Sequence, residues 1–177
     1  MTHKILMVRP CKGVDTGGFL DCGHAWSKHF DSRGDWVPVE SGQPGYHSGR
    51  DISCPVGTPM VSPIDGLVLV VGWQDPVDHK VGLGYRLIIK PAVIYLGYDN
   101  VLISPSVSIG HMSEIYAVVG AKVRAGIDHI GLSGNTGHTT GPHVHAQALD
   151  TRFRPARPLP FDWCTMDQYK DQRSTIS

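Results

Sequence analysis

The residues best suited to chemistry lie in one short segment, GNTGHTTGPHVHAQ, residues 134–147. His143 and His145 are separated by one residue, and alternate side chains of a strand point to the same face. The glycine-rich turn and Pro142 before them favour an extended segment here. Because histidine is the commonest metal ligand and titrates near neutral pH, the pair could supply a ligand and a proton carrier. The pattern alone also fits a half-buried strand with two polar residues.

A second polar segment, HSGRD, places His47 and Asp51 four residues apart. On an extended chain this spacing keeps both side chains on one face. With one histidine of the distal strand they make a set of three protein ligands that suits zinc and leaves the fourth position for water. A water molecule on such an ion has a pKa of about 7. The two segments therefore predict a catalytic site with one zinc ion.

Length and composition restrict the class of protein. The 177 residues fit one domain with a proper core. Sixteen basic and sixteen acidic residues balance, which gives no electrostatic reason to expect nucleic acid or an anionic membrane as partner. Twenty-one glycines and thirteen prolines favour a turn-rich β protein over a helical bundle.

The hydrophobic pattern predicts strands along most of the chain. The apolar run 67–73 fits a strand that is buried on both faces. Further short strands are expected at 85–90, at 101–104 and through the valine- and glycine-rich run 118–134. Helical turns are expected only at 112–116 and around 166–170. These patterns predict an all-β fold.

Three segments are expected along the chain. Residues 1–43 are predicted to be an irregular N-terminal arm, residues 44–149 the catalytic domain, and residues 150–177 a proline-rich strap and tail anchored by Phe161 and Trp163. The N-terminus lacks the apolar stretch of a secretory signal, and no segment is long enough to insert into a membrane. We therefore expect synthesis in the cytoplasm.

The cysteines are expected to be free thiols, since no signal peptide is present; they are Cys11, Cys22, Cys54 and Cys164. Together with His24 and His29, the first two could be drawn as a second zinc site. Their spacing fits no compact ligand pattern, so packing and loop roles are expected instead. His3, His79 and His129 are likewise expected to be surface or packing residues.

The motifs resemble the lysostaphin-type, or LytM-type, zinc endopeptidases, which cut the peptides of bacterial cell walls. The resemblance runs in the family's order through HSGRD (47–51), GTPMVSPIDGLV (57–68), GHMS (110–113), VGAKVRAGIDHIGLSGNTG (119–137) and TGPHVH (140–145). It implies a mainly antiparallel sheet with a groove. It also implies that His47, Asp51 and His145 bind zinc and that His111 and His143 are catalytic, in roles that stay open between them.

The chain departs from the family pattern in three places. Tyr46 directly precedes the first ligand, Ile109 stands where a tyrosine is usual, and Ala146 replaces a common aromatic residue. These departures leave open which tyrosine, if any, assists the transition state. His138 in the glycine turn and Gln147 on the histidine strand are weaker candidates for contact with substrate or ligands.

The resemblance implies a peptidoglycan peptide as substrate, either a cross-link or a stem peptide. Loops 74–84 and 92–100 are expected to decide which bond is cut. A non-catalytic wall-binding protein and a structural component of a virus particle remain alternatives. A swinging-arm carrier domain would need a modifiable lysine at a hairpin tip, and neither Lys80 nor Lys122 stands in a suitable sequence context. The missing signal peptide favours a bacteriophage origin, as an endolysin or as a virion protein with a tail-assembly partner.

Overall fold

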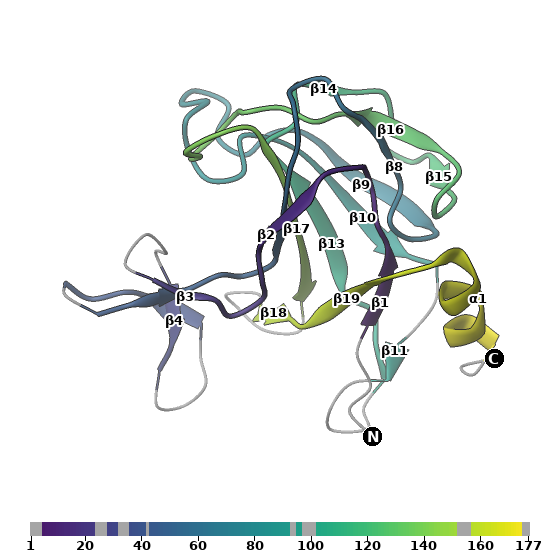
Figure 1. The fold of residues 1–177 in the computed structure, drawn as a ribbon, viewed down its shortest axis with the longest axis horizontal. Coiled ribbons are helices and arrows are strands. Elements are labelled where there is room, and N and C mark those ends of the chain that lie inside the picture. The colour runs from purple at the N-terminus through teal and green to yellow at the C-terminus, as the bar shows by residue number, and fades with distance from the viewer. Residues whose placement is uncertain are drawn as a thin grey trace.

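The computed structural model describes residues 5–23, 28–31, 36–41, 43–92, 95–96, 102–151 and 157–174. These residues form short strands and one helix (Figure 1). The strands are β1 (Ile5–Val8), β2 (Val14–Gly17), β3 (Cys22–Gly23), β4 (Lys28–Phe30), β5 (Trp36–Pro38), β6 (Gly45–Tyr46), β7 (Arg50–Ser53), β8 (Pro59–Val61), β9 (Gly66–Trp73), β10 (Tyr85–Pro91), β11 (Tyr95–Leu96), β12 (Leu102–Ile103), β13 (Ser106–Gly110), β14 (Glu114–Ile115), β15 (Lys122–Val123), β16 (His129–Leu132), β17 (His143–Asp150), β18 (Arg157–Leu159) and β19 (Phe161–Cys164); the helix is α1 (Met166–Ser174).

One large antiparallel sheet forms the frame of the molecule. Its strand order is β15-β9-β10-β13-β17-β7-β2, and β18 pairs with β17 beside this path. A smaller sheet with the order β14-β16-β8 lies at the top of Figure 1. The prediction of a mainly antiparallel all-β fold is confirmed. β1 and β19, which pair in parallel, cross in front of the large sheet in this view.

The large sheet is buried on one face. Leu87, Ile109 and Ala146 lie opposite one another on β10, β13 and β17, and each is 0% exposed. The prediction that the run 67–73 is buried on both faces is wrong, because Val68 is 1% exposed whereas Leu67 is 38% exposed. An antiparallel sheet can leave its second face to solvent, and this sheet does so along β9.

The segments on either side of residues 44–149 contribute to the same core. Residues before 44, predicted to be an irregular arm, contain β1 to β5, and β2 pairs with β7 in the large sheet. At the other end Phe161 is 1% exposed, and Trp163 packs against it with ring centroids 5.1 Å apart. The domain boundaries themselves stay predictions.

The chain forms helix at one of the two predicted places. α1 begins with a capping box, in which Gln168 N donates to Thr165 Oγ1 (3.3 Å) and Thr165 N donates to Gln168 Oε1 (2.9 Å). The expected turn at 112–116 is wrong, because Glu114 and Ile115 pair with β16 as strand β14. Within the part of the chain that the structure describes, the helix is too short and too polar to span a bilayer.

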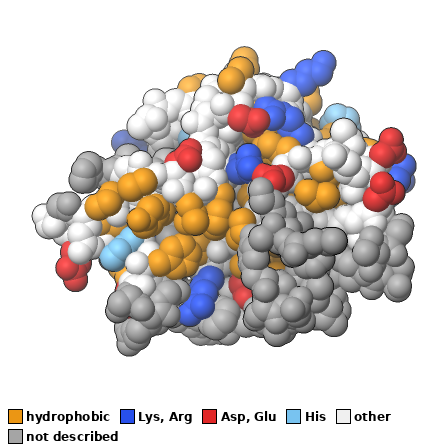
Figure 2. All heavy atoms as spheres, turned by 60° about the horizontal axis from the view of Figure 1, so that its bottom comes forward, with side chains coloured by type: hydrophobic (Ala, Val, Ile, Leu, Met, Phe, Trp, Pro, Cys, Tyr) orange, Lys and Arg blue, Asp and Glu red, His pale blue; other side chains and the backbone are white. Residues whose placement is uncertain are grey.

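The surface carries two apolar features. A cavity of about 620 Å³ lies between α1 and the β9–β15 edge, lined by Leu67, Val123, Met166 and Tyr169 among others. Figure 2 shows hydrophobic side chains gathered on the side where β3 and β4 lie in Figure 1. None of the histidines lines the cavity, so the site must be located from the ligand geometry.

The packing of the C-terminal strap predicts a large stability effect at Phe161. Replacing Phe161 with alanine removes a fully buried ring, so we expect the free energy of unfolding to fall by about 3–5 kcal/mol. Val77, which is 91% exposed, supplies the control, and its change to alanine should alter stability by less than about 0.5 kcal/mol. Urea unfolding of both variants measures the difference. Equal midpoints would show that the strap does not belong to the core.

Candidate metal centre

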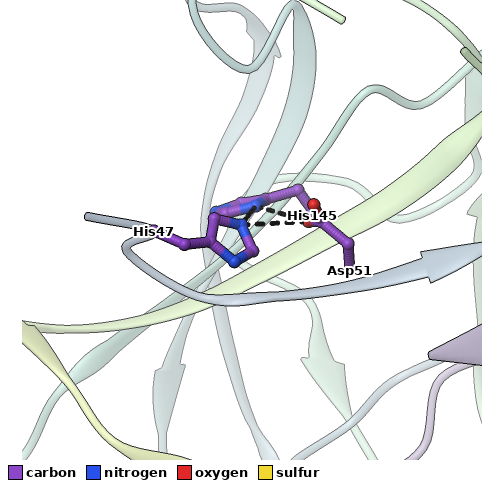
Figure 3. A group of neighbouring side chains, drawn as sticks. All are labelled: His47, Asp51 and His145. Atoms are coloured by element: carbon purple, nitrogen blue, oxygen red, sulfur yellow. Dashed lines mark hydrogen bonds and ion pairs between the residues drawn. The ribbon is translucent and has the colours of Figure 1, made fainter. Parts of the chain in front are cut away.

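Three side chains from distant parts of the chain converge on one point. His47 Nε2 lies 3.0 Å from His145 Nδ1, and Asp51 Oδ1 lies 2.8 Å from His145 Nδ1 and 3.2 Å from His47 Nε2. Figure 3 shows the two rings and the carboxylate turned toward one another. Among the described residues this is the one group of three or more histidine, cysteine, aspartate or glutamate side chains that could hold a metal ion.

The separations fit zinc. Tetrahedral bonds of 2.0–2.1 Å to nitrogen and oxygen place neighbouring ligand atoms about 3.3 Å apart. The three observed separations of 2.8–3.2 Å are close to this value. Two imidazoles and one carboxylate form a donor set that suits zinc, and three ligands leave a position open. The residues therefore fit the ion that the sequence predicts.

Sheet register brings two of these residues together. His145 on β17 lies directly opposite Asp51 on β7. Between β6 and β7 the chain passes so close to β17 that a Cβ on Gly49 would lie 2.1 Å from Ala146 O. Only glycine permits this approach. It holds the segment that carries His47 against β17.

Hydrogen bonds outside the cluster orient both histidines. His47 Nδ1 donates to Gly18 O (2.9 Å), and His145 Nε2 donates to Gln147 Oε1 (3.2 Å). These bonds direct His47 Nε2 and His145 Nδ1 toward the cluster, which is how proteins usually fix a metal-binding imidazole. Gln147, a weak candidate from its place on the histidine strand, thus touches the cluster. Gly18 was not predicted, because its part is played by a backbone carbonyl.

The electrostatics of the cluster favour a charged carboxylate. Burial would raise the pKa of Asp51, but the interactions with the His145 and His47 imidazoles outweigh burial and hold this pKa well below its ordinary value. The carboxylate is therefore ionised across the neutral range. An ionised carboxylate between two imidazoles attracts a divalent cation.

The two remaining predicted histidines lie beside the cluster. His143 Nε2 is 3.8 Å from Asp51 Oδ1, and its Nδ1 donates to Gly141 O (2.8 Å). The His111 ring centroid lies 4.4 Å from that of His143, and His111 Nδ1 donates to Thr136 O (2.7 Å). Each ring thus holds its proton on Nδ1 and has a lone pair on Nε2.

His111 occupies an unusual environment. It is 4% exposed, and burial followed by the nearby His143 and His145 lowers its pKa from 6.5 to about 4, although the bond to Thr136 opposes this. Its backbone is left-handed, with φ of 59°. His111 N donates to Leu83 O (2.7 Å), so loop 74–84 holds this strained residue in place.

The other predicted residues lie further from the cluster. Tyr46 is half-buried on β6 beside His47, and His138 is exposed, with its backbone N–H donating to Gly82 O (2.8 Å). His29 is half-buried, and His79 and His129 are exposed. His3, His24 and much of loop 92–100 lie outside the described residues. All four cysteines are free.

Comparison with known proteins identifies the family. The model of peptidase family M23 matches residues 45–155, which is more than half of the chain. This match, the β-sheet frame and the His/Asp/His cluster define a zinc metallopeptidase. The chain belongs to peptidase family M23, which confirms the resemblance to the lysostaphin-type enzymes.

Individual relatives agree with this assignment. The chain is 32% identical over 113 residues to the peptidoglycan DD-endopeptidase ShyA of Vibrio cholerae, covering 64% of this chain and 22% of ShyA. It is 32% identical over 120 residues to the glycyl-glycine endopeptidase ALE-1 of Staphylococcus capitis, covering 66% of this chain and 29% of ALE-1. The chain thus spans less than a third of either relative.

A solved structure supports the fold. The catalytic domain of the prophage-encoded M23 protein EnpA from Enterococcus faecalis, crystallised as a point mutant, matches with a TM-score of 0.57 and 27% identity. The match covers 85% of this chain and 92% of that domain. The likeness therefore includes most of what the structure describes here.

Zinc content tests the ligand assignment. We expect about one zinc ion per chain after dialysis of the zinc-loaded protein, and substantially less after His145→Ala, because two remaining ligands hold the ion weakly. Gln147→Ala should lower zinc affinity about 10-fold to 100-fold, because His145 loses the bond that orients it. His129→Ala, which changes an exposed histidine on β16, is the matched control. Full zinc occupancy in the His145 variant would contradict the assignment.

Proposed function

We propose that this chain is a zinc-dependent endopeptidase that hydrolyses peptide bonds of bacterial peptidoglycan. The observation that carries the proposal is the convergence of His47, Asp51 and His145 on one point, with His143 and His111 beside it. The names of ShyA and ALE-1, both endopeptidases, the first of peptidoglycan, support the substrate class. Zinc held by the three ligands would polarise the scissile carbonyl and activate water at neutral pH.

His143 is the proton acceptor in this proposal. Its Nε2 faces the cluster, 3.8 Å from Asp51 Oδ1, and carries a lone pair because Nδ1 donates to Gly141 O. Water can give its proton to Nε2 as it attacks the scissile carbonyl carbon. Thr139 Oγ1, 3.1 Å from His143 Nδ1, helps to hold the ring. The imidazolium formed can then protonate the leaving nitrogen.

His111 is the proposed hydrogen-bond donor to the oxyanion or to the leaving amine. Its ring lies against that of His143, with centroids 4.4 Å apart, and its centroid is 6.1 Å from that of His145. Because burial lowers its pKa to about 4, His111 is neutral before the reaction. Its Nε2 donates to the developing oxyanion or to the amine only after it takes a proton from His143. Because the two histidines are in contact, one proton can serve either ring.

The combination of three metal ligands with two further histidines favours catalysis over mere binding of wall peptide. A non-catalytic wall-binding or virion protein of this fold would need neither three ligands nor two further rings with their lone pairs directed inward. Here all five side chains are present, and hydrogen bonds orient four of them. Buried polar groups of this kind are costly unless they have partners, and a bound ion and substrate would supply them.

Activity on purified peptidoglycan tests the proposal. His143→Ala should lower kcat about 100-fold to 10,000-fold while zinc stays bound, because it removes proton transfer and leaves the ligands. His129→Ala should leave kcat unchanged, and a chelator should abolish activity in a manner that added zinc restores. Mass spectrometry of the released fragments identifies the bond that is cut. Wild-type activity in the His143 variant would exclude this histidine as the base.

We also propose that the chain comes from a bacteriophage or prophage. This origin is supported by the likeness to EnpA, a prophage-encoded protein, and would make the chain an endolysin or a virion protein with a tail-assembly partner. Electron microscopy with antibody against this chain on purified particles distinguishes the two. Labelled tails would indicate a virion component, and unlabelled particles with activity in lysates would indicate a free lysin.

A further inference from the structure

The face of the large sheet opposite the core carries a basic side chain that the proposed chemistry does not use. Leu87 on β10 and Ala146 on β17 face the core. Neighbouring residues of a strand face opposite sides, so Arg86 and His145 lie on the other face. Continuing the register of β10 with β13 places Arg86 opposite Gly110, which lies opposite His145.

Arg86 lacks a counter-ion among the described residues. Its Nε is buried and has no hydrogen-bond partner, and no ion pair or hydrogen bond of this side chain is found within the described ranges. Burial lowers the pKa of the guanidinium, and no neighbouring charge contributes to the shift. Arginine stays charged at this degree of burial. An unpaired, partly buried charge is costly, and an anion placed beside it would remove that cost.

A second unpaired polar group lies next to Arg86. Ser108 on β13 is opposite Ile88 on β10 and opposite Gln147 on β17, so it lies on the same face and diagonal to Arg86. Its Oγ is buried and has no hydrogen-bond partner in the part of the chain that is described. Buried polar side-chain atoms without partners are uncommon in proteins. Two such groups, diagonal to one another on neighbouring strands of one face, mark a place where a single ligand could bond to both.

Polar side chains connect Arg86 and Ser108 with the metal cluster. Gln147 Oε1 accepts from His145 Nε2, and Gln147 lies opposite Ser108. Above Gly110 the space is filled, since a Cβ there would lie 2.8 Å from Leu83 Cβ. Leu83 therefore occupies the space over Gly110, directly between Arg86 and His145. The polar side chains that lead from His145 to Arg86 are Gln147 and Ser108.

We propose that Arg86, with Ser108, binds a free carboxylate of the peptide substrate. This rests on the proposed peptidase function and names the substrate class: peptides with an acidic group near the scissile bond. A guanidinium binds a carboxylate with two parallel hydrogen bonds, and a serine hydroxyl can donate a third. A chain of glycines offers no side-chain carboxylate for this place.

The position of Arg86 restricts where the acidic group lies. Two strand spacings separate the backbones of Arg86 and His145, about 10 Å. An extended peptide covers this distance in about three residues. The carboxylate therefore belongs to a residue within about three positions of the bond that is cut, and a carboxylate farther away cannot reach both sites.

Kinetics on a matched pair of substrates test this inference. Soluble cross-linked peptidoglycan fragments are prepared with their carboxylates free, and a second portion is converted to carboxamides with carbodiimide and ammonia. The zinc-loaded wild-type enzyme should have a kcat/KM about 10-fold to 100-fold higher for the free acids, because a charge-assisted bond is lost on amidation. In Arg86→Gln the ratio should fall to about one.

Control variants separate binding from folding and from general charge. Arg86→Gln should keep its rate on the amidated fragments, which shows that the variant is folded. Arg86→Lys should give an intermediate ratio, because lysine keeps the charge but loses the two-bond geometry. Lys90→Gln removes a positive charge from an exposed residue of the same strand and should keep the wild-type ratio. Equal wild-type rates on both portions, or an unchanged ratio in Arg86→Gln, would overturn the inference.

A binding measurement distinguishes failure of the carboxylate site from failure of the proposed peptidase function. Metal-free protein is titrated calorimetrically with the two portions of fragments, which it cannot hydrolyse by the proposed route. Tighter binding of the free acids, lost in Arg86→Gln, would support the carboxylate site even if no zinc-dependent cleavage is found. Equal binding of both portions would overturn it, whether or not the enzyme cuts peptidoglycan.

Discussion

The pairing of β17 with β7 is the constraint on which the site depends, because it places His145 opposite Asp51. A shift of one residue in this register would turn every side chain of β17 to the other face. The register is fixed from the buried side, where Val144 and Ala146 of β17 and Ile52 of β7 are each 0% exposed. Core packing therefore determines the geometry of the metal cluster, although none of these core side chains is among its ligands.

Backbone carbonyls orient the histidine rings that the strand register brings together. Gly18, Gly141 and Thr136 each accept a hydrogen bond from the outer nitrogen of one histidine, so three loops set three ring orientations. Each bond leaves the lone pair of the other nitrogen for a ligand or a proton. His111 shows what this arrangement costs, because a left-handed backbone at a residue other than glycine is unfavourable by about 1–2 kcal/mol. The bond from its N–H to Leu83 O holds it there.

The sequence predicts the residues of the site better than it predicts the loops that hold them. His47, Asp51 and His145 could be found from residue type and spacing, and the family resemblance selected His145 over His143 as the ligand. Gly18 carries no such signal, because its contribution is a carbonyl that any residue possesses. A short segment such as 112–116 fits a helical turn or a strand equally well. Only its pairing with β16 decides the outcome.

The prediction that residues 67–73 are buried on both faces is wrong on the face of the sheet that carries the metal cluster. A continuous apolar run suggests a strand covered on both sides, yet Leu67 and Leu69 are 38% and 40% exposed. The face of the sheet to which Leu67 belongs also holds His145 and Arg86. A peptide can reach a metal cluster on a sheet only if no second layer covers that face. The exposed apolar side chains of β9 are therefore compatible with the proposed function, in which a peptide lies over this face.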